Sequence, residues 1–219
     1  MEDIKIIDIK SKSYPELLKK ISDPPKIIYV RGEIYPEENC FAVVGSRKCS
    51  FYGKQVASEI SRDLSESGLT IVSGLALGID AAAHQAAVKK KKRTIGVLGT
   101  GIDDESFYPK ENLGLAKEII ENNGCLISEY PPGTRGSRFS FPQRDRIISG
   151  LSLGILVVEA KERSGSLIAA QWAKKQERKI FSVPGNVYFS NSKGTNFLIK
   201  NGAVLTESAK DILKELKIT

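Results

Sequence analysis

Arginine and phenylalanine alternate in one short stretch of this chain, residues 134–146. The basic and aromatic positions of that stretch are Arg135, Arg138, Phe139, Phe141, Arg144 and Arg146. Guanidinium groups bind phosphate oxygens bidentately, and aromatic faces stack on bases. Serine, glycine and proline in the same stretch predict a loop. Such a loop suits a single-stranded nucleic acid, whose bases are free to stack. The alternative is an ordinary surface loop with its phenylalanines in the core, and we expect at least one ring to be buried there.

A second candidate phosphate site is the turn formed by Gly45, Ser46 and Arg47. It follows the apolar run 41–44 and precedes apolar residues at a spacing of four, which are Val56, Ile60 and Leu64. This pattern predicts a buried strand, a tight turn and a helix. Because a helix N-terminus offers unpaired N–H groups and partial positive charge, the turn predicts a phosphate site, to which Arg47 adds a guanidinium. The alternative is a turn in which Gly45 serves only close packing.

Glycines follow most of the predicted strands. The positions concerned are Gly45, Gly74, Gly99, Gly101, Gly133 and Gly165. Since the carboxyl ends of parallel strands meet at one edge of a sheet, several anion-binding turns would lie side by side and could hold a nucleic-acid backbone. The expected contacts from these turns are Gly45, Ser46, Gly74, Gly78, Gly99, Gly101, Ser164 and Ser166. The alternative is that such turns favour glycine for conformational reasons alone.

A nicotinamide dinucleotide site is the obvious competitor, and the sequence disfavours it. That site requires G-x-G-x-x-G after the first strand and an acidic residue about 20 residues later. The first turn contains only Gly45, and the second strand ends in Ser73 and Gly74 without a carboxylate. The turn at 99–104 lacks the third glycine.

Three weaker candidates also have structural explanations. His84 could be a general base oriented by Asp80, but a structural pair one helical turn apart explains the spacing better. The basic run 89–93 fits a solvated helix end better than a DNA contact. Glu159 could be a catalytic carboxylate at a strand end or the partner of Arg163.

The elements that must position these residues alternate between strand and helix from residue 39 onward. Predicted strands cover 41–44, 69–73, 94–98, 124–128, 153–158 and 179–183, with a helix through Lys175 after the fifth of them. This pattern predicts an α/β fold with a doubly wound, mostly parallel sheet and helices on both faces. Residues 1–38, with possible strands at 4–9 and 26–32 and a short helix at 14–21, form an N-terminal extension too small for its own core. We expect it to pack against the domain at 39–219.

Composition agrees with a globular protein that binds a polyanion. Of the 219 residues, 41% are hydrophobic, and the formal net charge is +7. The cysteines Cys40, Cys49 and Cys125 lack metal-ligand spacing and are expected to be reduced, as in the cytoplasm. The start of the sequence lacks signal-peptide features, and no apolar run is long enough for a membrane span.

Motifs in order along nearly the whole chain resemble the DprA/Smf family of DNA-processing proteins. They include residues 45–47, 73–80, 99–103, 108–112, 128–133, 141–152, 159–160, 164–168, 183–185, 194–196 and 202–203, together with Tyr14-Pro15 and Asp23-Pro24-Pro25. The resemblance implies an extended Rossmann fold that binds single-stranded DNA and loads a RecA-type recombinase, in natural transformation where the host is competent. It also implies a homodimer built near the C-terminal part, including residues 194–203, and no catalytic activity.

By matching positions, the resemblance makes Arg47, Arg144 and Arg146 the expected DNA contacts. Asp145 departs from the family, which usually has asparagine there. A carboxylate at this position repels phosphates unless Arg144 and Arg146 neutralise it, or it caps a helix beginning at Arg146. Because the sequence ends at residue 219, we expect neither the winged-helix-like domain that often follows this fold nor the small helical domain that often precedes it.

The sequence therefore predicts a non-enzymatic single-stranded DNA-binding protein without catalytic residues, metal or cofactor. Arg47, Arg144, Arg146 and the turn amides would hold the backbone, and Phe139 or Phe141 would stack on bases. The alternative is a binder or enzyme of a small nucleotide-derived phosphate ligand, which would use the same turns but would not need the arginine–phenylalanine stretch.

Overall fold

The computed structural model describes residues 4–218; residues 1–3 of the predicted extension and residue 219 of the predicted main domain lie outside the described residues. The first elements are β1 (Ile4–Asp8), α1 (Glu16–Lys19), β2 (Ile27–Gly32), β3 (Cys40–Val44), α2 (Phe51–Glu66), β4 (Thr70–Ser73), α3 (Ile79–Lys89) and β5 (Thr94–Leu98). They continue with α4 (Leu113–Glu121), β6 (Cys125–Ser128), α5 (Ser140–Gly150), β7 (Gly154–Val157), α6 (Gly165–Lys175), β8 (Lys179–Ser182), α7 (Lys193–Lys200), β9 (Val204–Leu205) and α8 (Ala209–Leu216).

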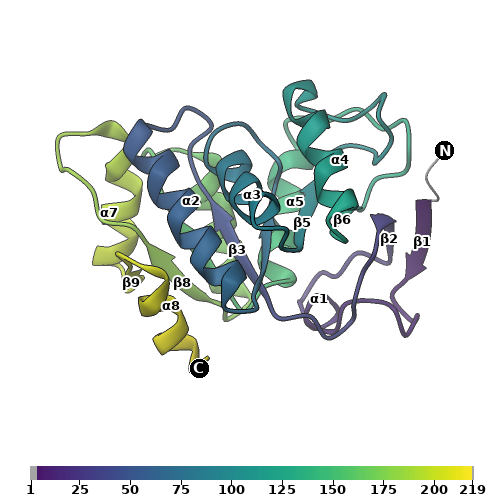
Figure 1. Ribbon diagram of the computed structural model, residues 1–219, viewed down its shortest axis with the longest axis horizontal. Helices are drawn as coiled ribbons and strands as arrows, with labels where there is room; N and C mark the ends of the chain where they lie inside the picture. Colours follow the sequence, from purple (N-terminus) through teal and green to yellow (C-terminus); the bar gives the residue numbers. More distant parts are fainter. Residues whose placement is uncertain (1–3, 219) are drawn as a thin grey trace.

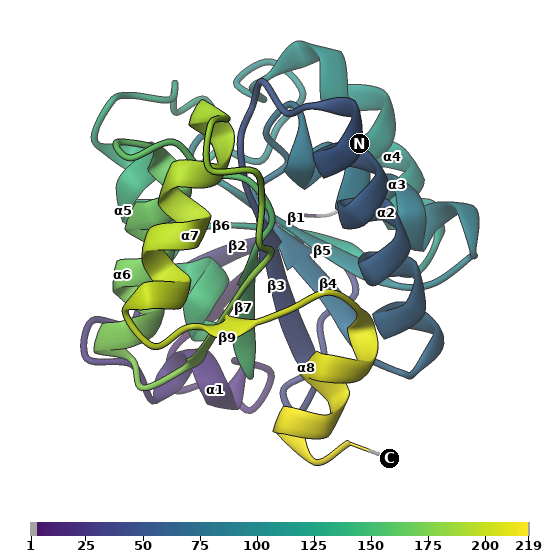
Figure 2. The same ribbon diagram turned by 90° about the vertical axis from the view of Figure 1, so that its left-hand side faces the viewer.

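The described strands form one nine-stranded sheet in the order β1-β2-β6-β5-β4-β3-β7-β8-β9. The pairs from β6 through to β9 are parallel, and β2 pairs antiparallel with both β1 and β6. Helices α2, α3, α4 and α8 cover one face, and α1, α5, α6 and α7 cover the other (Figure 2). The prediction of a doubly wound, mostly parallel α/β sheet is confirmed.

The central strand β3 shows why this sheet is covered on both sides. Cys40, Ala42 and Val44 pack into the core beneath α5 and α6, whereas Phe41 and Val43 pack beneath α2 and α3. Successive side chains of a strand point to opposite faces, so a continuous apolar run needs a helix layer on each side. This accounts for the mostly apolar sequences of the buried strands at 40–44, 70–73 and 94–98.

The N-terminal segment adds the two strands at one end of the sheet, and β1 lies at the right of Figure 1, far from β9. Tyr29 pairs with Ser128 and Arg31 with Leu126 in the antiparallel ladder between β2 and β6. The buried Tyr14 hydroxyl donates to the Pro25 carbonyl at 2.7 Å and holds the connection between α1 and β2. A boundary at residue 38 remains a prediction, since these strands belong to the same sheet as the rest.

Strand order creates a switch point beside β3. The chain leaves β3 through α2 toward β4 on one side, whereas β7 lies on the other side of β3 and leads through α6 to β8. The loops that follow β3 and β7 therefore diverge to opposite faces and leave a crevice at the carboxyl ends of these strands. The loop after β3 lies at the upper edge of the molecule in Figure 1.

The prediction that residues 134–146 form a loop is wrong for their second half. Helix α5 begins at Ser140, with Phe139 at the N-cap position, and continues to Gly150. Pro142 is the third helical residue, where the missing N–H has no helical partner to lose. Asp145 lies in the middle of the helix, so it does not cap a helix beginning at Arg146.

Within residues 4–218, no helix has both the length and the apolar character needed to span a bilayer.

Candidate nucleic-acid interface

A cavity of about 530 Å³ opens at the switch point between β3 and β7. Its walls come from the turn after β3, from the segment that joins β7 to α6, and from α5. The polar and charged lining residues are Ser46, Arg47, Lys48, Asp80, Arg138, Arg144, Asp145, Lys161, Ser164 and Ser166. The crevice therefore contains five cationic side chains and two carboxyl groups.

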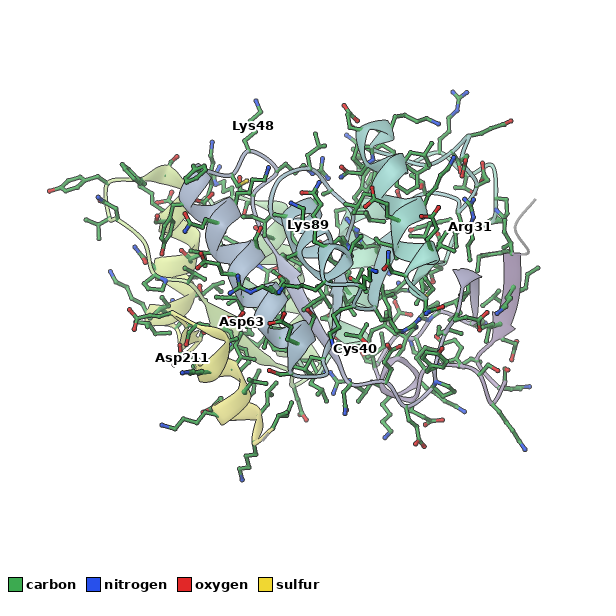
Figure 3. All side chains as sticks on the ribbon, in the orientation of Figure 1. Arg31, Cys40, Lys48, Asp63, Lys89 and Asp211 are labelled. Atoms are coloured by element: carbon green, nitrogen blue, oxygen red, sulfur yellow. The ribbon has the colours of Figure 1, made fainter. Side chains whose placement is uncertain are left out.

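Four of the lining cations are exposed: Arg47, Lys48, Arg138 and Lys161. Toward the described residues, none of the four forms an ion pair. Figure 3 shows Lys48 pointing outward from the upper edge of the molecule. Free cations that converge on one concave surface are the electrostatic signature of a site for a polyanion.

The N-terminus of α6 also faces this cavity. Ser164 at the N-cap, Gly165 and Ser166 line it, no acidic residue occupies the first turn, and no side chain caps the helix. The Ser164 and Ser166 hydroxyls lie 2.9 Å apart and bond to each other. Because this eleven-residue helix presents uncapped N–H groups beside free cations, it suits a phosphate group.

The N-terminus of α2, by contrast, is already neutralised. The Glu159 carboxylate accepts hydrogen bonds from the N–H and the hydroxyl of Ser50, which is the N-cap of α2, and from Asn191. Of the two alternatives considered for Glu159, the pair with Arg163 does not form among the described residues, and the carboxylate at Ser50 makes the α2 N-terminus a poorer phosphate site than predicted. Arg47 precedes α2 by four residues and reaches the cavity from the turn itself.

Arg144 forms the base of the cavity and is almost completely buried. Its Nη1 donates to the carbonyls of Gly74 at 2.7 Å and Val97 at 2.6 Å, and its Nε lies 3.2 Å from an oxygen of Asp145. The guanidinium thus ties α5 to the ends of β4 and β5. Arginine stays charged when buried, so Arg144 places a fixed positive charge under the cavity.

Arg146 lies on a different side of α5 and does not line the cavity. Its side chain is 3% exposed and pairs with Glu129 at 2.6 Å and with Asp23 at 3.1 Å. Residues two apart on a helix point about 200° apart, so Arg144 and Arg146 cannot both face one cavity. The expectation that the two arginines act together is corrected: Arg146 attaches the N-terminal segment to α5.

Several predicted anion-binding glycines are buried and already bonded. The N–H of Gly74 donates to Asp80 at 3.1 Å, and the N–H of Gly101 donates to the Thr134 carbonyl at 2.8 Å. A side chain at Gly74 would collide with the Arg144 guanidinium, and one at Gly99 would lie 2.8 Å from the Phe141 ring. The expected row of open turns is therefore absent at these three positions: Gly74 and Gly99 make room for α5, and Gly101 packs against Ser106, Asp103 and the Pro131 carbonyl.

Gly45 and Gly78 also serve close packing. A Cβ at Gly45 would lie 2.6 Å from Ile79, and one at Gly78, where φ is +81°, would collide with the Ser46 carbonyl. Ile79 donates its N–H to that same carbonyl at 3.2 Å. These contacts fix the turn that presents Arg47, which agrees with the packing explanation considered for Gly45.

Two carboxyl groups lie beneath the cations. Burial raises the pKa of Asp145 to about 7, although Arg144 and Arg47 act in the opposite direction. Burial also raises the pKa of Asp80, which faces Arg144 and accepts from Gly74. Asp145 is 9% exposed, lines the cavity and accepts no hydrogen bond from a donor group among the described residues, apart from its ion pair with Arg144. The charge of the cavity therefore depends on pH near neutrality.

The aromatic residues of the predicted stretch lie at the surface. Phe139 is 71% exposed, and Phe141 is half-buried between the Tyr108 ring, 5.8 Å away, and the Arg47 guanidinium, 5.6 Å away. The expectation that at least one phenylalanine belongs to the buried core is wrong. Arg135 is exposed but does not line the cavity.

The weaker candidates have structural roles. His84 is fully buried, contacts the Thr94 hydroxyl at 2.8 Å, and burial lowers its pKa to about 3, so it stays neutral. Asp80 bonds to Gly74 and not to His84. Within residues 4–218 there is no cluster of three or more potential metal ligands.

Sequence reasoning missed Lys48 and Lys161 as cavity residues. Lys48 follows Arg47 directly, and Lys161 lies in the connection after β7, as does the predicted Ser164. Both residues follow strands that flank the switch point, and this position could have identified them. The strand order, which the sequence did not reveal, was needed to recognise it.

Residues 5–217 match the family model described as DNA recombination-mediator protein A. The chain belongs to this family. It is 43% identical over 217 residues to the DNA processing protein DprA of Bacillus subtilis. The aligned region covers 98% of this chain and 72% of that protein. It is 41% identical over 213 residues to protein Smf of Escherichia coli, of which it spans 56%.

Solved structures of the family share this fold. The X-ray structure of DprA from Streptococcus pneumoniae superposes with a TM-score of 0.89 at 40% identity, covering 98% of this chain and 75% of that chain. DprA from Helicobacter pylori, whose structure concerns its single-stranded DNA binding mode, superposes with a TM-score of 0.86 at 29% identity. That superposition covers 98% of this chain and 96% of the Helicobacter chain.

Proposed function

We propose that this protein binds single-stranded DNA in the cavity between β3 and β7. The observation that carries the proposal is a concave surface with four exposed cations that form no ion pair within residues 4–218, beside a partly exposed aromatic pair. The single-stranded DNA binding described for the Helicobacter pylori relative supports it. Binding needs no chemical step, and we propose a non-enzymatic role.

Phosphate capture would occur at the rim of the cavity. Arg47 and Lys48 approach from the turn after β3, and Lys161 and the N–H groups of Gly165 and Ser166 approach from the opposite wall. Charge-assisted hydrogen bonds from arginine and helix N-termini are the strong contacts that a phosphodiester can make. Arg144 contributes its buried charge from below without leaving its carbonyl partners.

Base contacts would come from the rings beside these cations. Phe141 and Tyr108 offer a partly exposed aromatic surface, and Arg47 lies over the Phe141 ring. A base that stacks on a ring needs no sequence-specific hydrogen bond, so the site would accept many sequences. Single strands are favoured because their bases are not already stacked in a duplex.

The family membership extends this proposal to recombination. We propose that the protein mediates recombination by loading a RecA-type recombinase onto bound DNA in the cytoplasm, including DNA taken up in natural transformation. The match to the recombination-mediator family supports this role.

We also propose a homodimer formed near the C-terminal part of the fold, as expected for residues 194–203. Exposed apolar side chains gather there: Val187, Tyr188, Phe189 and Phe197, and a mostly apolar cavity of about 610 Å³ adjoins α7. A second copy would bury this patch and would present two DNA sites on one particle, which increases avidity. Light scattering on the wild type and on Phe197→Asp tests it, with a monomeric wild type as the contradicting result.

Fluorescence anisotropy with labelled oligonucleotides of graded length tests the DNA-binding proposal. Affinity should rise with length and fall steeply with salt, because each phosphate contact releases counterions. The alternative, a small nucleotide-derived ligand, predicts tight mononucleotide binding without length dependence. That result would replace the DNA proposal.

A further inference from the structure

A second groove continues from the proposed DNA site along the seam between α5 and α6, which lie side by side (Figure 2). Its volume is about 600 Å³, and its walls come from residues 137–143 and from α6. Arg138, Pro142 and Ile168 line both this groove and the cavity between β3 and β7. The two hollows therefore meet at a shared wall.

The groove combines aromatic rings with cations. Phe139 and Trp172 line it, Arg138 lies 4.8 Å from the centre of the Phe139 ring, and Lys175 lies 4.7 Å from the centre of the Trp172 ring. Among the described residues, no acidic side chain lines the groove. Both cations are exposed and neither forms an ion pair within residues 4–218.

Trp172 is held in a fixed orientation. Its indole N–H donates to the Pro142 carbonyl at 3.2 Å, which links α6 to the first turn of α5. The ring is half-buried, and the exposed Lys175 side chain lies over it. A ring fixed at its polar edge and open on one face is suited to stacking.

Resting on the proposed function, we propose that a single strand bound in the cavity between β3 and β7 continues past Arg138 into this groove, where its next bases stack on Phe139 and Trp172. Base–aromatic stacking is stronger than an exposed cation–π contact, so a base displaces each cation from its ring. The released Arg138 and Lys175 then contact the phosphates of the same nucleotides. The groove is thus an extension of the binding site for single-stranded DNA.

Trp172 is the only tryptophan of the chain and therefore reports on this groove directly. In wild-type protein, tryptophan emission should be quenched by single-stranded oligonucleotides and not by a dinucleotide that fills the first cavity alone. Anisotropy of the same labelled oligonucleotides, from two to about 20 nucleotides, measures binding independently. Unchanged Trp172 emission at saturation with the longest oligonucleotide overturns the extension and leaves the proposed function intact. Absence of binding at every length overturns both.

Substitutions separate stacking from packing. Trp172→Leu and Trp172→Phe both lose the hydrogen bond to Pro142, but only the leucine variant loses the aromatic face. The leucine variant should bind long oligonucleotides about tenfold more weakly than the phenylalanine variant, with a difference that shrinks as the oligonucleotide is shortened. Equal affinities of the two variants overturn the proposal.

The contribution of Lys175 can be tested against its neighbour Lys174 as a matched control. Lys175→Gln should weaken binding of long oligonucleotides and reduce the salt slope by about one, whereas Lys174→Gln, which alters an exposed lysine outside the groove, should not. Equal effects of the two substitutions count against the groove. A second copy of the chain could occupy the groove instead. In that case, tryptophan emission would change with protein concentration in the absence of DNA and would not change on addition of DNA, and this result would overturn the proposal.

Discussion

The cavity between β3 and β7 and the cluster around Arg93 are built from the same kinds of side chains. In the cavity, the Arg47 guanidinium lies 5.6 Å from the Phe141 ring centre; in the cluster, the Arg93 guanidinium lies 4.5 Å from the Tyr35 ring centre. Arg93 is paired with both oxygens of Glu38, and this ion pair is largely buried. Arg47 is exposed and has no carboxylate partner among the described residues.

The two arginines differ in one carboxylate partner: Glu38 makes Arg93 a structural residue, whereas Arg47 has the DNA-binding role that we propose. Arg93 also donates to the carbonyls of Glu33 and Asn123, so it joins three segments at the far end of the sheet strands. A guanidinium that has satisfied its donors inside the protein has none left for a phosphate. Arg47 forms no ion pair within residues 4–218, so its donors are available for the phosphate contact proposed above.

The largest expected effect is the loss of stability on substituting Arg144. This residue lines the cavity, but like Arg93 its guanidinium is bonded to other parts of the protein. Arg144→Ala should lower the free energy of unfolding by about 3–5 kcal/mol, because two strand-end carbonyls and Asp145 lose their buried cation. Urea denaturation measures the change. Arg135→Ala, an exposed arginine of the same stretch, is the control and should stay within about 0.5 kcal/mol of wild type. An Arg144 variant of wild-type stability would show that the cavity does not depend on this residue.

Arg93→Ala should give the next largest effect, a loss of about 2–3 kcal/mol of unfolding free energy, since its ion pair is mostly but not wholly buried. DNA affinity of the folded variant should equal that of the wild type. Denaturation and anisotropy on the same preparation test both statements. Weaker DNA binding without a change in stability would reverse the assigned roles of Arg93 and Arg47.

Arg47→Ala should have the opposite effect to Arg93→Ala, weakening DNA binding and leaving stability unchanged. We expect a loss of about 1.5 kcal/mol in binding, or about tenfold in Kd, because one charge-assisted phosphate contact disappears. The salt slope of binding should decrease by about one. Lys89→Ala removes an exposed cation from the end of α3, away from the cavity, and is the matched control. An isotherm for Arg47→Ala that coincides with wild type would exclude Arg47 from the site.

The smallest effect concerns Asp145, one of the two carboxyl groups that line the cavity. Because burial raises its pKa to about 7, it is mostly neutral at lower pH and ionises as the pH rises through that value. Ionisation brings negative charge toward the phosphates, so affinity should fall between about pH 6 and pH 8, by about threefold. Asp145→Asn cannot ionise and should remove this part of the pH dependence while binding normally at pH 6. The same pH dependence in both proteins would assign it to another group.

The pattern of apolar strands was sufficient to predict the sheet and its helices on both faces. The run 40–44 has no polar position and 94–98 has only Thr94, as expected for strands of a parallel sheet that is covered on both faces. The motifs along the chain were sufficient for the family. The turn at 45–47 was also placed correctly after the first strand of the parallel sheet, with Arg47 exposed.

The roles of the arginines could not be predicted in the same way. Treating 134–146 as a loop left Arg144 and Arg146 free to act together, whereas α5 turns one toward the strand ends and the other toward Glu129 and Asp23. Gly74 and Gly99, which follow β4 and β5, are typical of anion-binding turns, but α5 covers them. These errors share a cause: once 140–150 forms a helix, its packing partners decide where each side chain points, and those partners are distant in the sequence.

The sequence by itself determined the layers of the fold, the family and the surplus of positive charge, since each depends on residue types and local periodicity. Tertiary structure decided which cations remain free. An arginine is paired within the protein when a carboxylate or carbonyl from another part of the chain lies within hydrogen-bond distance of its guanidinium. The strand order and the helix packing set the distance between those groups.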